Sequence, residues 1–165
     1  MIFGRKKRSI VRLLVVEDEP LVAFDTEHLL TDRDYEIVAT VDRVVDALAV
    51  IETGVDIHLV LVDVALADGT GIDVARAASE RDIPVMFVTG NCPGDAEAYA
   101  TGCLAKPYTQ RALLSAINAV EAAIEGRRPG RLPSGFRLFA NKAVPAPAPV
   151  KRAGGAEEQG ATFDA

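Results

Sequence analysis

Short, almost wholly apolar runs alternate with segments of helical periodicity between residues 10 and 125, and this alternation restricts the fold more than any other feature. The apolar runs cover residues 10–16, 35–40, 57–62, 83–88 and 102–105. Helical spacing of apolar residues follows each run. Five strands separated by helices predict an α/β fold with a doubly wound parallel sheet, because parallel strands need crossover connections and both faces of such a sheet are covered.

The predicted helices begin and end at residues with known roles. Pro20 stands where a first-turn helix proline belongs, with Asp18 or Glu19 as the cap. Gly54 ends the second helix. Apolar residues at Leu113 and three later positions form a stripe that makes the last helix amphipathic. We therefore expect helices over 20–31, 44–51, 72–80, 95–100 and 113–124.

Charge and composition divide the chain into three parts. Residues 1–9 carry four basic and no acidic residues, and residues 126–165 carry seven basic and three acidic residues, which leaves a net charge of −14 on residues 10–125 within a total of −6. Such an acidic body would repel nucleic-acid phosphates. We expect a basic leader (1–9), one folded domain (10–125) and a largely flexible Pro/Gly/Ala-rich tail (126–165), polyproline II-like over 143–149. An apolar island at 135–140 is a surface segment or a docking motif.

The number of cysteines and the length of the apolar runs indicate where in the cell the protein is expected. Two cysteines in 165 residues are too few for a disulfide scaffold. The apolar runs are far shorter than the ~20 residues of a membrane helix, and no apolar segment of signal-peptide length follows the basic leader. These features predict a cytoplasmic protein without membrane insertion. Cys103 is expected to be a buried, inert thiol. Cys92 lies on a loop, where a redox role is the alternative.

Polar residues stand at the carboxyl ends of four predicted strands. Glu17 and Asp18 follow the first strand, and Asp63 follows the third. Thr89 ends the fourth strand, and Lys106 follows the fifth. The carboxyl ends of parallel strands meet at one rim of the sheet, where ligands of such folds bind. Three carboxylates, one hydroxyl and one ammonium are therefore expected in one place.

This set of groups has the chemistry of metal-assisted phosphoryl transfer. Carboxylates ~4 Å apart repel each other by roughly 4 kcal/mol at an effective dielectric constant of about 20. Mg²⁺ relieves that repulsion and bridges carboxylates to phosphate oxygens. Thr89 and Lys106 can donate to the remaining oxygens, and Gly90 leaves room above them. Asp63 is then the predicted nucleophile, forming an aspartyl phosphate.

Four segments together resemble the receiver domain of two-component response regulators. They are Val15-Val16-Glu17-Asp18-Glu19-Pro20, Leu61-Val62-Asp63 with Asp68-Gly69-Thr70-Gly71 after it, Phe87-Val88-Thr89-Gly90, and Lys106-Pro107-Tyr108. The resemblance implies a flavodoxin-like (βα)5 fold with strand order 2-1-3-4-5. It also implies Mg²⁺ on Asp18, Asp63 and the Ala65 carbonyl, with Glu17 acting mainly through water.

The resemblance further implies how the protein works and with what. Asp63 would accept phosphate from a sensor histidine kinase or a histidine phosphotransfer protein. Thr89 would move to bond the phosphoryl group, and Lys106 would pair with it. The chain would then signal through a downstream protein or act as a phosphate sink. The signal surface would be the fourth helix, fifth strand and fifth helix, with Pro107 and Tyr108 at its edge.

The sequence departs from typical receivers at one switch position. They carry Tyr or Phe three residues before the lysine, where this chain has Cys103. The segment 84–91 is similar to the motif of the FAT-GUY class of single-domain regulators, which it matches at Pro84, Phe87, Thr89 and Gly90. That class switches without the usual aromatic residue.

Two other function classes stay open from the residues alone. A Mg-dependent phosphohydrolase is suggested by Asp68-Gly69-Thr70, although Asp63 lies five residues upstream of Asp68 rather than two. A flavodoxin relative would need a phosphate-binding loop after the first strand, where this chain has three acids. No helix-turn-helix pattern follows residue 125, so direct DNA binding is not expected.

Overall fold

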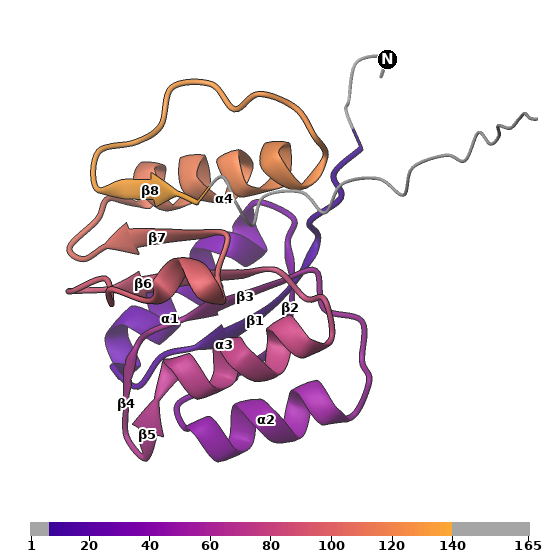
Figure 1. The fold of residues 1–165 in the computed structure, drawn as a ribbon, viewed down its shortest axis with the longest axis vertical. Coiled ribbons are helices and arrows are strands. Elements are labelled where there is room, and N and C mark those ends of the chain that lie inside the picture. The colour runs from indigo at the N-terminus through magenta and orange to yellow at the C-terminus, as the bar shows by residue number, and fades with distance from the viewer. Residues whose placement is uncertain (1–6, 140–165) are drawn as a thin grey trace, which may run out of the picture.

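The computed structural model describes residues 7–139, which form a six-stranded sheet with helices on both faces (Figure 1). Five strands are parallel and lie in the order β2-β1-β3-β6-β7. Their bounds are β1 Arg12–Val16, β2 Glu36–Val41, β3 Leu59–Val62, β6 Val85–Thr89 and β7 Gly102–Ala105. The order confirms the predicted flavodoxin-like arrangement, in which the chain starts in the middle of the sheet and winds outward in both directions.

Helices cover the sheet because alternate side chains of each apolar strand point to opposite faces. The helices are α1 Pro20–Asp32, α2 Val44–Glu52, α3 Gly71–Glu80 and α4 Gln110–Ile124. One buried cluster joins α2 and α3 to strand residues such as Val60 and Phe87. The other joins α1 and α4 to the alternate strand residues, such as Leu61 and Met86.

The starts of α1, α2 and α3 lie within one residue of the predicted positions, whereas α4 begins three residues before the predicted residue 113. Only some of these helices have a side-chain cap. The hydroxyl of Thr70 accepts from the N–H of Ile72 at 3.1 Å at the start of α3. Thr109 accepts from the N–H of Ala112 at 3.0 Å at the start of α4. Glu19 occupies the N-cap position of α1 without a side-chain capping bond. Its carboxylate is therefore available to the site described below.

Three elements differ from the predictions. The helix expected over 95–100 is a single 3-10 turn, η1 Ala96–Ala98, because Pro93, Gly94 and the start of β7 leave room for little more. A small antiparallel pair, β4 Ala65–Leu66 and β5 Gly69–Thr70, fills the connection before α3.

The third difference lies in the predicted tail. Within the apolar island, β8 Phe136–Leu138 pairs antiparallel to β7 and becomes the sixth strand of the sheet. Its arrow runs against that of β7 in Figure 1. The island thus returns to the domain over a loop from Gly126, and the remainder of the tail, including the expected polyproline stretch at 143–149, lies outside the described residues.

The two cysteines form a disulfide, so the expectation of an inert Cys103 thiol is wrong. Cys103 is fully buried in β7, as predicted, but it is bonded to Cys92 in the loop after β6. The loop folds back across this face of the sheet and brings the two Cα atoms to 6.4 Å, which a disulfide can span. The two cysteines are eleven residues apart in sequence, and this spacing alone does not predict that the loop brings them together.

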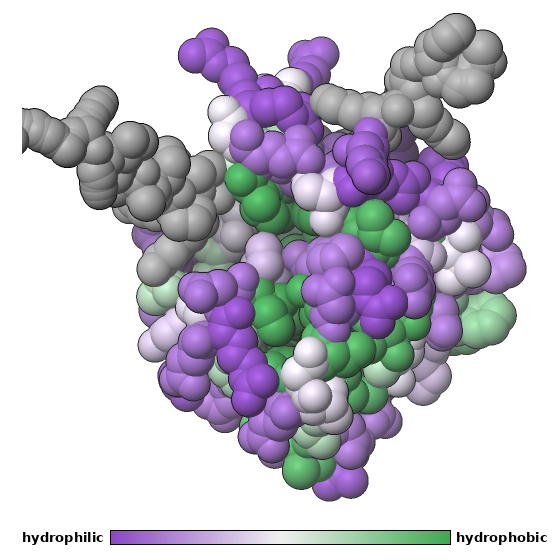
Figure 2. Space-filling view, turned by 90° about the vertical axis from the view of Figure 1, so that its right-hand side faces the viewer, coloured by the Kyte–Doolittle hydropathy of each residue, from purple (hydrophilic) through white to green (hydrophobic). Residues whose placement is uncertain are grey.

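On the face at the right-hand side of Figure 1, hydrophilic side chains surround a central apolar area (Figure 2). Within residues 7–139, none of the helices has the length and apolar character that crossing a bilayer requires.

Candidate functional site

The backbone of the sheet continues past the strand ends and holds the acidic residues in place. The N–H of Glu17 donates to the carbonyl of Val41 at 2.9 Å. The N–H of Asp63 donates to Val16 at 3.0 Å. Both acids are therefore fixed by ladder hydrogen bonds rather than carried on a free loop.

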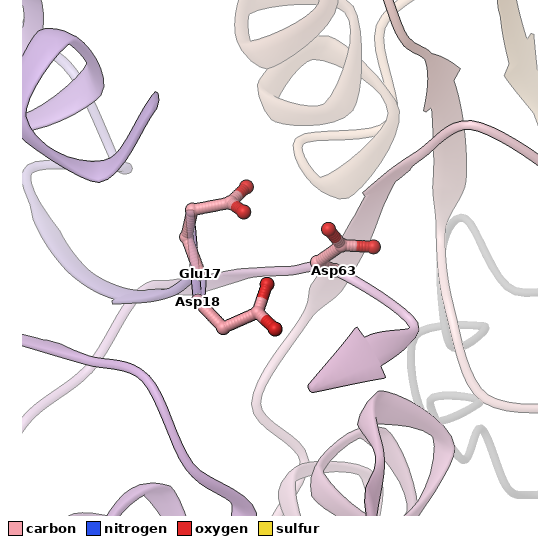
Figure 3. A group of neighbouring side chains, drawn as sticks. All are labelled: Glu17, Asp18 and Asp63. Carbon is pink, nitrogen blue, oxygen red and sulfur yellow. The ribbon is translucent and has the colours of Figure 1, made fainter. Parts of the chain in front are cut away.

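The structure brings the three predicted carboxylates together. Glu17 and Asp18 come from the end of β1 and Asp63 from the end of β3, and their carboxyl groups point into the same space (Figure 3). One oxygen of each lies within 4.8 Å of the others. Glu17 is 6% exposed and Asp63 is 7% exposed, whereas Asp18 is half-buried. Carboxylates this close and this buried repel strongly unless a cation lies between them.

Lys106 supplies part of that positive charge. Its Nζ lies 2.9 Å from Asp63 Oδ2 and 2.9 Å from Glu17 Oε1, and its side chain is 16% exposed. Burial by itself would lower the pKa of Lys106, but hydrogen bonds to Glu19, Asp63 and Glu17 raise it above its usual value. The ammonium therefore stays charged at neutral pH.

The Glu17 carboxyl is affected both by its burial and by its hydrogen bonds. Burial raises the pKa of the Glu17 carboxyl above its usual value, even though the hydrogen bonds from Lys106 and from the N–H of Glu19 lower it. A group of opposite charge added to the cluster would be stabilised there.

The connection after Asp63 packs closely and orients the side chain. The N–H of Ala65 donates to Asp63 Oδ1 at 3.3 Å. The N–H of Gly71, the first residue of α3, donates to the carbonyl of Val64 at 2.7 Å. A Cβ at position 71 would collide with the Asp63 carbonyl oxygen, so glycine is required for this approach. Asp63 is held between the end of β3 and the start of α3.

Thr89 and Gly90 lie at the end of β6. The N–H of Lys106 donates to the Thr89 carbonyl at 2.8 Å, which ties the two residues together through the backbone. Thr89 is 5% exposed, and its hydroxyl accepts a long hydrogen bond of 3.4 Å from the N–H of Asn91. A Cβ on Gly90 would meet no atom within 4 Å apart from its chain neighbours, so the space beside residue 90 is open.

Pro107 and Tyr108 form one wall of a cavity beside the site. The Lys106–Pro107 peptide is cis, and the Tyr108 hydroxyl lies 3.5 Å from Thr26 Oγ1. Burial raises the pKa of Tyr108 above its usual value. The cavity, of about 460 Å³, extends from Lys106 and Glu19 along α1 to Leu113 of α4. A molecule that docks in this cavity would contact Glu19 and Lys106.

Two acids have positions that sequence reasoning did not assign. Glu19 Oε1 lies 2.7 Å from Lys106 Nζ, so the residue predicted as a helix cap is a third carboxylate partner of the lysine. Asp68 accepts from the N–H groups of Val44 and Val45 at 2.6 and 3.1 Å and thereby caps α2. The first of these bonds lowers the pKa of Asp68 most. Its engagement with α2 removes the residue on which the phosphohydrolase alternative relied.

The donor set fits a hard divalent cation. All side-chain donors of the cluster are carboxylate oxygens, and no histidine or thiol belongs to this group. Mg²⁺ prefers oxygen ligands and is commonly held by one or two carboxylates together with water and phosphate oxygens. The acids of the cluster also outnumber the lysine that binds them, which favours the same ion.

Comparison with known proteins gives one consistent result. The family described as response regulator receiver domain matches residues 13–118. The phyllosphere-induced regulator PhyR of Methylorubrum extorquens is 30% identical over 114 residues, which cover 64% of this chain and 41% of that protein. The chain therefore spans less than half the length of this relative.

Solved structures agree with the sequence match. The receiver domain of PhyR from Erythrobacter litoralis has a TM-score of 0.59 at 27% identity, covering 66% of this chain and 88% of that domain. A CheY-like receiver domain from Methanospirillum hungatei has a TM-score of 0.59 at 28% identity, covering 66% of this chain and 91% of that one.

Proposed function

The chain belongs to the response regulator receiver domain family, and from this premise we propose that Asp63 accepts a phosphoryl group from a sensor histidine kinase or a histidine phosphotransfer protein. The observation that carries the proposal is the position of Asp63. It is buried, lies within 4.8 Å of two other acids and is paired with Lys106 at 2.9 Å. A carboxylate so placed meets charge stabilisation for the phosphoryl group it would receive.

The proposed reaction is an in-line transfer. An oxygen of the Asp63 carboxylate forms a bond to phosphorus while the bond from phosphorus to the donor's imidazole nitrogen breaks, and the imidazole leaves. Lys106 would then pair with a phosphoryl oxygen. The Thr89 hydroxyl would donate to another, which is supported by the backbone hydrogen bond that ties Thr89 to Lys106.

Mg²⁺ is the proposed cofactor, held by Asp18, Asp63 and the Ala65 carbonyl, with Glu17 acting through water. When bound, it offsets the negative charge that builds up between carboxylates and phosphoryl oxygens. The position of the Asp63 carboxylate is set by the protein itself. Lys106 orients the carboxylate, and the connection to α3 holds it in place.

The family and the site favour signalling over metabolism. We propose that the phosphorylated chain acts on a downstream protein or drains phosphate from its kinase. The similarity of residues 84–91 to the FAT-GUY class stays a prediction, as does the absence of direct DNA binding.

Stoichiometry of labelling tests the proposal. The full chain is incubated with Mg²⁺ and acetyl phosphate, a small phosphodonor, and its intact mass is measured over time. We expect one phosphoryl group per chain, formed only with Mg²⁺, and consumption of the donor limited by loss of that group. Rapid donor hydrolysis without a covalent adduct would instead support the phosphohydrolase alternative.

Metal binding is expected to depend on Asp18. Calorimetric titration with Mg²⁺ should show one site in the wild-type chain, and Asp18→Asn should weaken binding by at least about tenfold, because a ligand carboxylate is lost. Asp46→Asn removes the same charge from an exposed position on α2 and should leave the affinity within about twofold, since exposed charges are screened. Equal losses in both variants would show that Asp18 is not a ligand.

A further inference from the structure

β8 covers the β7 edge of the parallel sheet, and Lys106 of the candidate site directly follows β7. It pairs with β7 in the register Gly102 with Leu138, Cys103 with Arg137 and Leu104 with Phe136. Figure 1 shows it as the outermost strand, beside β7. β8 lies beyond the residues that match the receiver family, which end at 118. The chain therefore fills its own sheet edge with a segment outside the family domain.

Two phenylalanines anchor this segment on opposite faces of the sheet. Phe136 is 7% exposed and belongs to the cluster that contains Leu104 and α4. Phe139 is 5% exposed and belongs to the opposite cluster, which contains Cys103. Gly102 makes room for this packing, because a Cβ there would lie 2.7 Å from Phe136 Cζ and 2.9 Å from the Arg137 carbonyl oxygen. The edge of β7 is thus shaped to receive a strand with an aromatic residue for each face.

The anchored strand is connected to the site through a row of backbone contacts. Thr89 of β6 pairs with Ala105 of β7. The N–H of Ala105 donates to the carbonyl of Gly135, directly before β8, at 2.9 Å. Ala105 is followed by Lys106, whose ammonium binds Asp63. A movement of Thr89 or Lys106 toward a phosphoryl group therefore acts on the residue that holds the beginning of β8.

The segment is also short and tethered by an exposed loop. β8 has three residues, and the N–H of Phe139 donates to the Thr101 carbonyl at 2.8 Å at its far end. Residues 126–135 before it are mostly exposed. Few main-chain bonds hold the strand, so a small loss of pairing free energy can open it locally while the rest of the sheet stays folded.

We propose that β8 is a displaceable strand and that the β7 edge beneath it is a binding surface for an extended peptide segment of a partner protein. The partner segment pairs antiparallel to β7 and carries two aromatic residues spaced as Phe136 and Phe139 are. This inference rests on the proposed function, since phosphorylation of Asp63 is what releases β8.

β8 and the partner segment compete for the same β7 edge, so β8 has to be released first. Because β8 is tethered to the domain, its effective concentration at this edge is in the millimolar range, higher than that of a free partner segment. Main-chain pairing then gives the partner affinity, and the two aromatic pockets give it specificity. In the unphosphorylated protein β8 covers the β7 edge, and in the phosphorylated protein this edge is accessible to the partner segment.

Amide exchange of the full chain tests release. Hydrogen exchange at Ala105 and Phe139 is measured by mass spectrometry with Mg²⁺, with and without acetyl phosphate present throughout. We expect exchange at both amides to become roughly tenfold faster in the phosphorylated wild type. The exchange rates of the β1 amides should not change. The intact mass of the same samples reports whether the phosphoryl group is present.

The double variant Phe136→Ala/Phe139→Ala tests the binding surface without phosphorylation. Removing both anchors should release β8 and leave Gly102 and the rest of the β7 edge unchanged, so the variant should bind a fluorescent peptide of sequence Ser-Gly-Phe-Arg-Leu-Phe, residues 134–139, at least about tenfold more tightly than the unphosphorylated wild type. Leu132→Ala is the matched control, because it removes an apolar side chain from an exposed position in the loop before β8. A peptide with alanine at both phenylalanine positions should not bind.

The outcomes separate the two proposals. Phosphorylated protein with unchanged exchange at Ala105 and Phe139 would overturn release and leave the proposed function intact. Phe136→Ala/Phe139→Ala protein with fast exchange at Ala105 but no peptide binding would overturn the binding surface. If no phosphoryl group forms, the proposed function and the release it drives both fail, and the measurement on the double variant still decides whether the edge binds a strand.

Discussion

Asp63→Asn is expected to reduce phosphorylation by acetyl phosphate to background, a fall of about a thousandfold or more. Asparagine keeps the shape of the side chain but lacks the anionic oxygen that attacks phosphorus. It also removes one of the two buried carboxylates that Lys106 binds. Intact mass spectrometry after incubation with Mg²⁺ and the donor measures the effect.

Asp68→Asn is the matched control for this substitution. Asp68 lies five residues further on and accepts from the N–H groups of Val44 and Val45. Asparagine can keep one such bond through its side-chain oxygen, and Asn is a good N-cap residue. This variant should be phosphorylated at a rate within about twofold of the wild type. A phosphoryl group on Asp63→Asn, or its loss in Asp68→Asn alone, would mean that Asp63 is not the acceptor.

Lys106→Met is expected to destabilise the protein by about 3 kcal/mol at neutral pH in the presence of a chelator. The substitution keeps most of the aliphatic stem but leaves Glu17 and Asp63, both buried, without their cation. Removing one member of a buried ion pair leaves an uncompensated charge, which costs more than losing a surface pair. The free energy of unfolding in urea, monitored by circular dichroism, measures the loss.

Mg²⁺ gives this prediction a second readout. If the cluster binds the ion, saturating Mg²⁺ should reduce the difference in free energy of unfolding between Lys106→Met and wild type by about 1 kcal/mol or more. The reason is that the metal replaces the missing positive charge. Arg111→Met, at an exposed position near the start of α4, should change stability by less than about 0.5 kcal/mol. A similarly small effect in Lys106→Met would show that the buried carboxylates do not depend on it.

The local sequence was sufficient for the parallel sheet and for the residues at its rim. The β-branched and leucine runs of the five parallel strands are too short for helices and too apolar for exposed loops. Their order follows from the family resemblance, and the structure confirms it. Because parallel strands end at a common rim, Asp18 and Asp63 could be expected near each other from their positions alone.

Other contacts had no local signal. In the sequence, Glu19 looks like any acid just before a helix, and its bond to Lys106 joins residues that are 87 positions apart. The disulfide between Cys92 and Cys103 depends on how a loop without regular structure folds back over β7. Asp68 lies in a turn motif that suggests phosphatase chemistry until its hydrogen bonds to α2 are seen.

The sequence by itself determined the α/β class, the parallel sheet and the acidic rim, because these follow from the period of apolar residues and from which residue types end the strands. Only the tertiary structure decided that Glu19 joins Lys106, that the cysteines are bonded and that β8 closes the sheet. Each of these depends on segments distant in sequence meeting in space. Phe136 is an apolar residue in a proline- and glycine-rich stretch, and it has room to pack because Gly102, 34 positions earlier, carries no side chain.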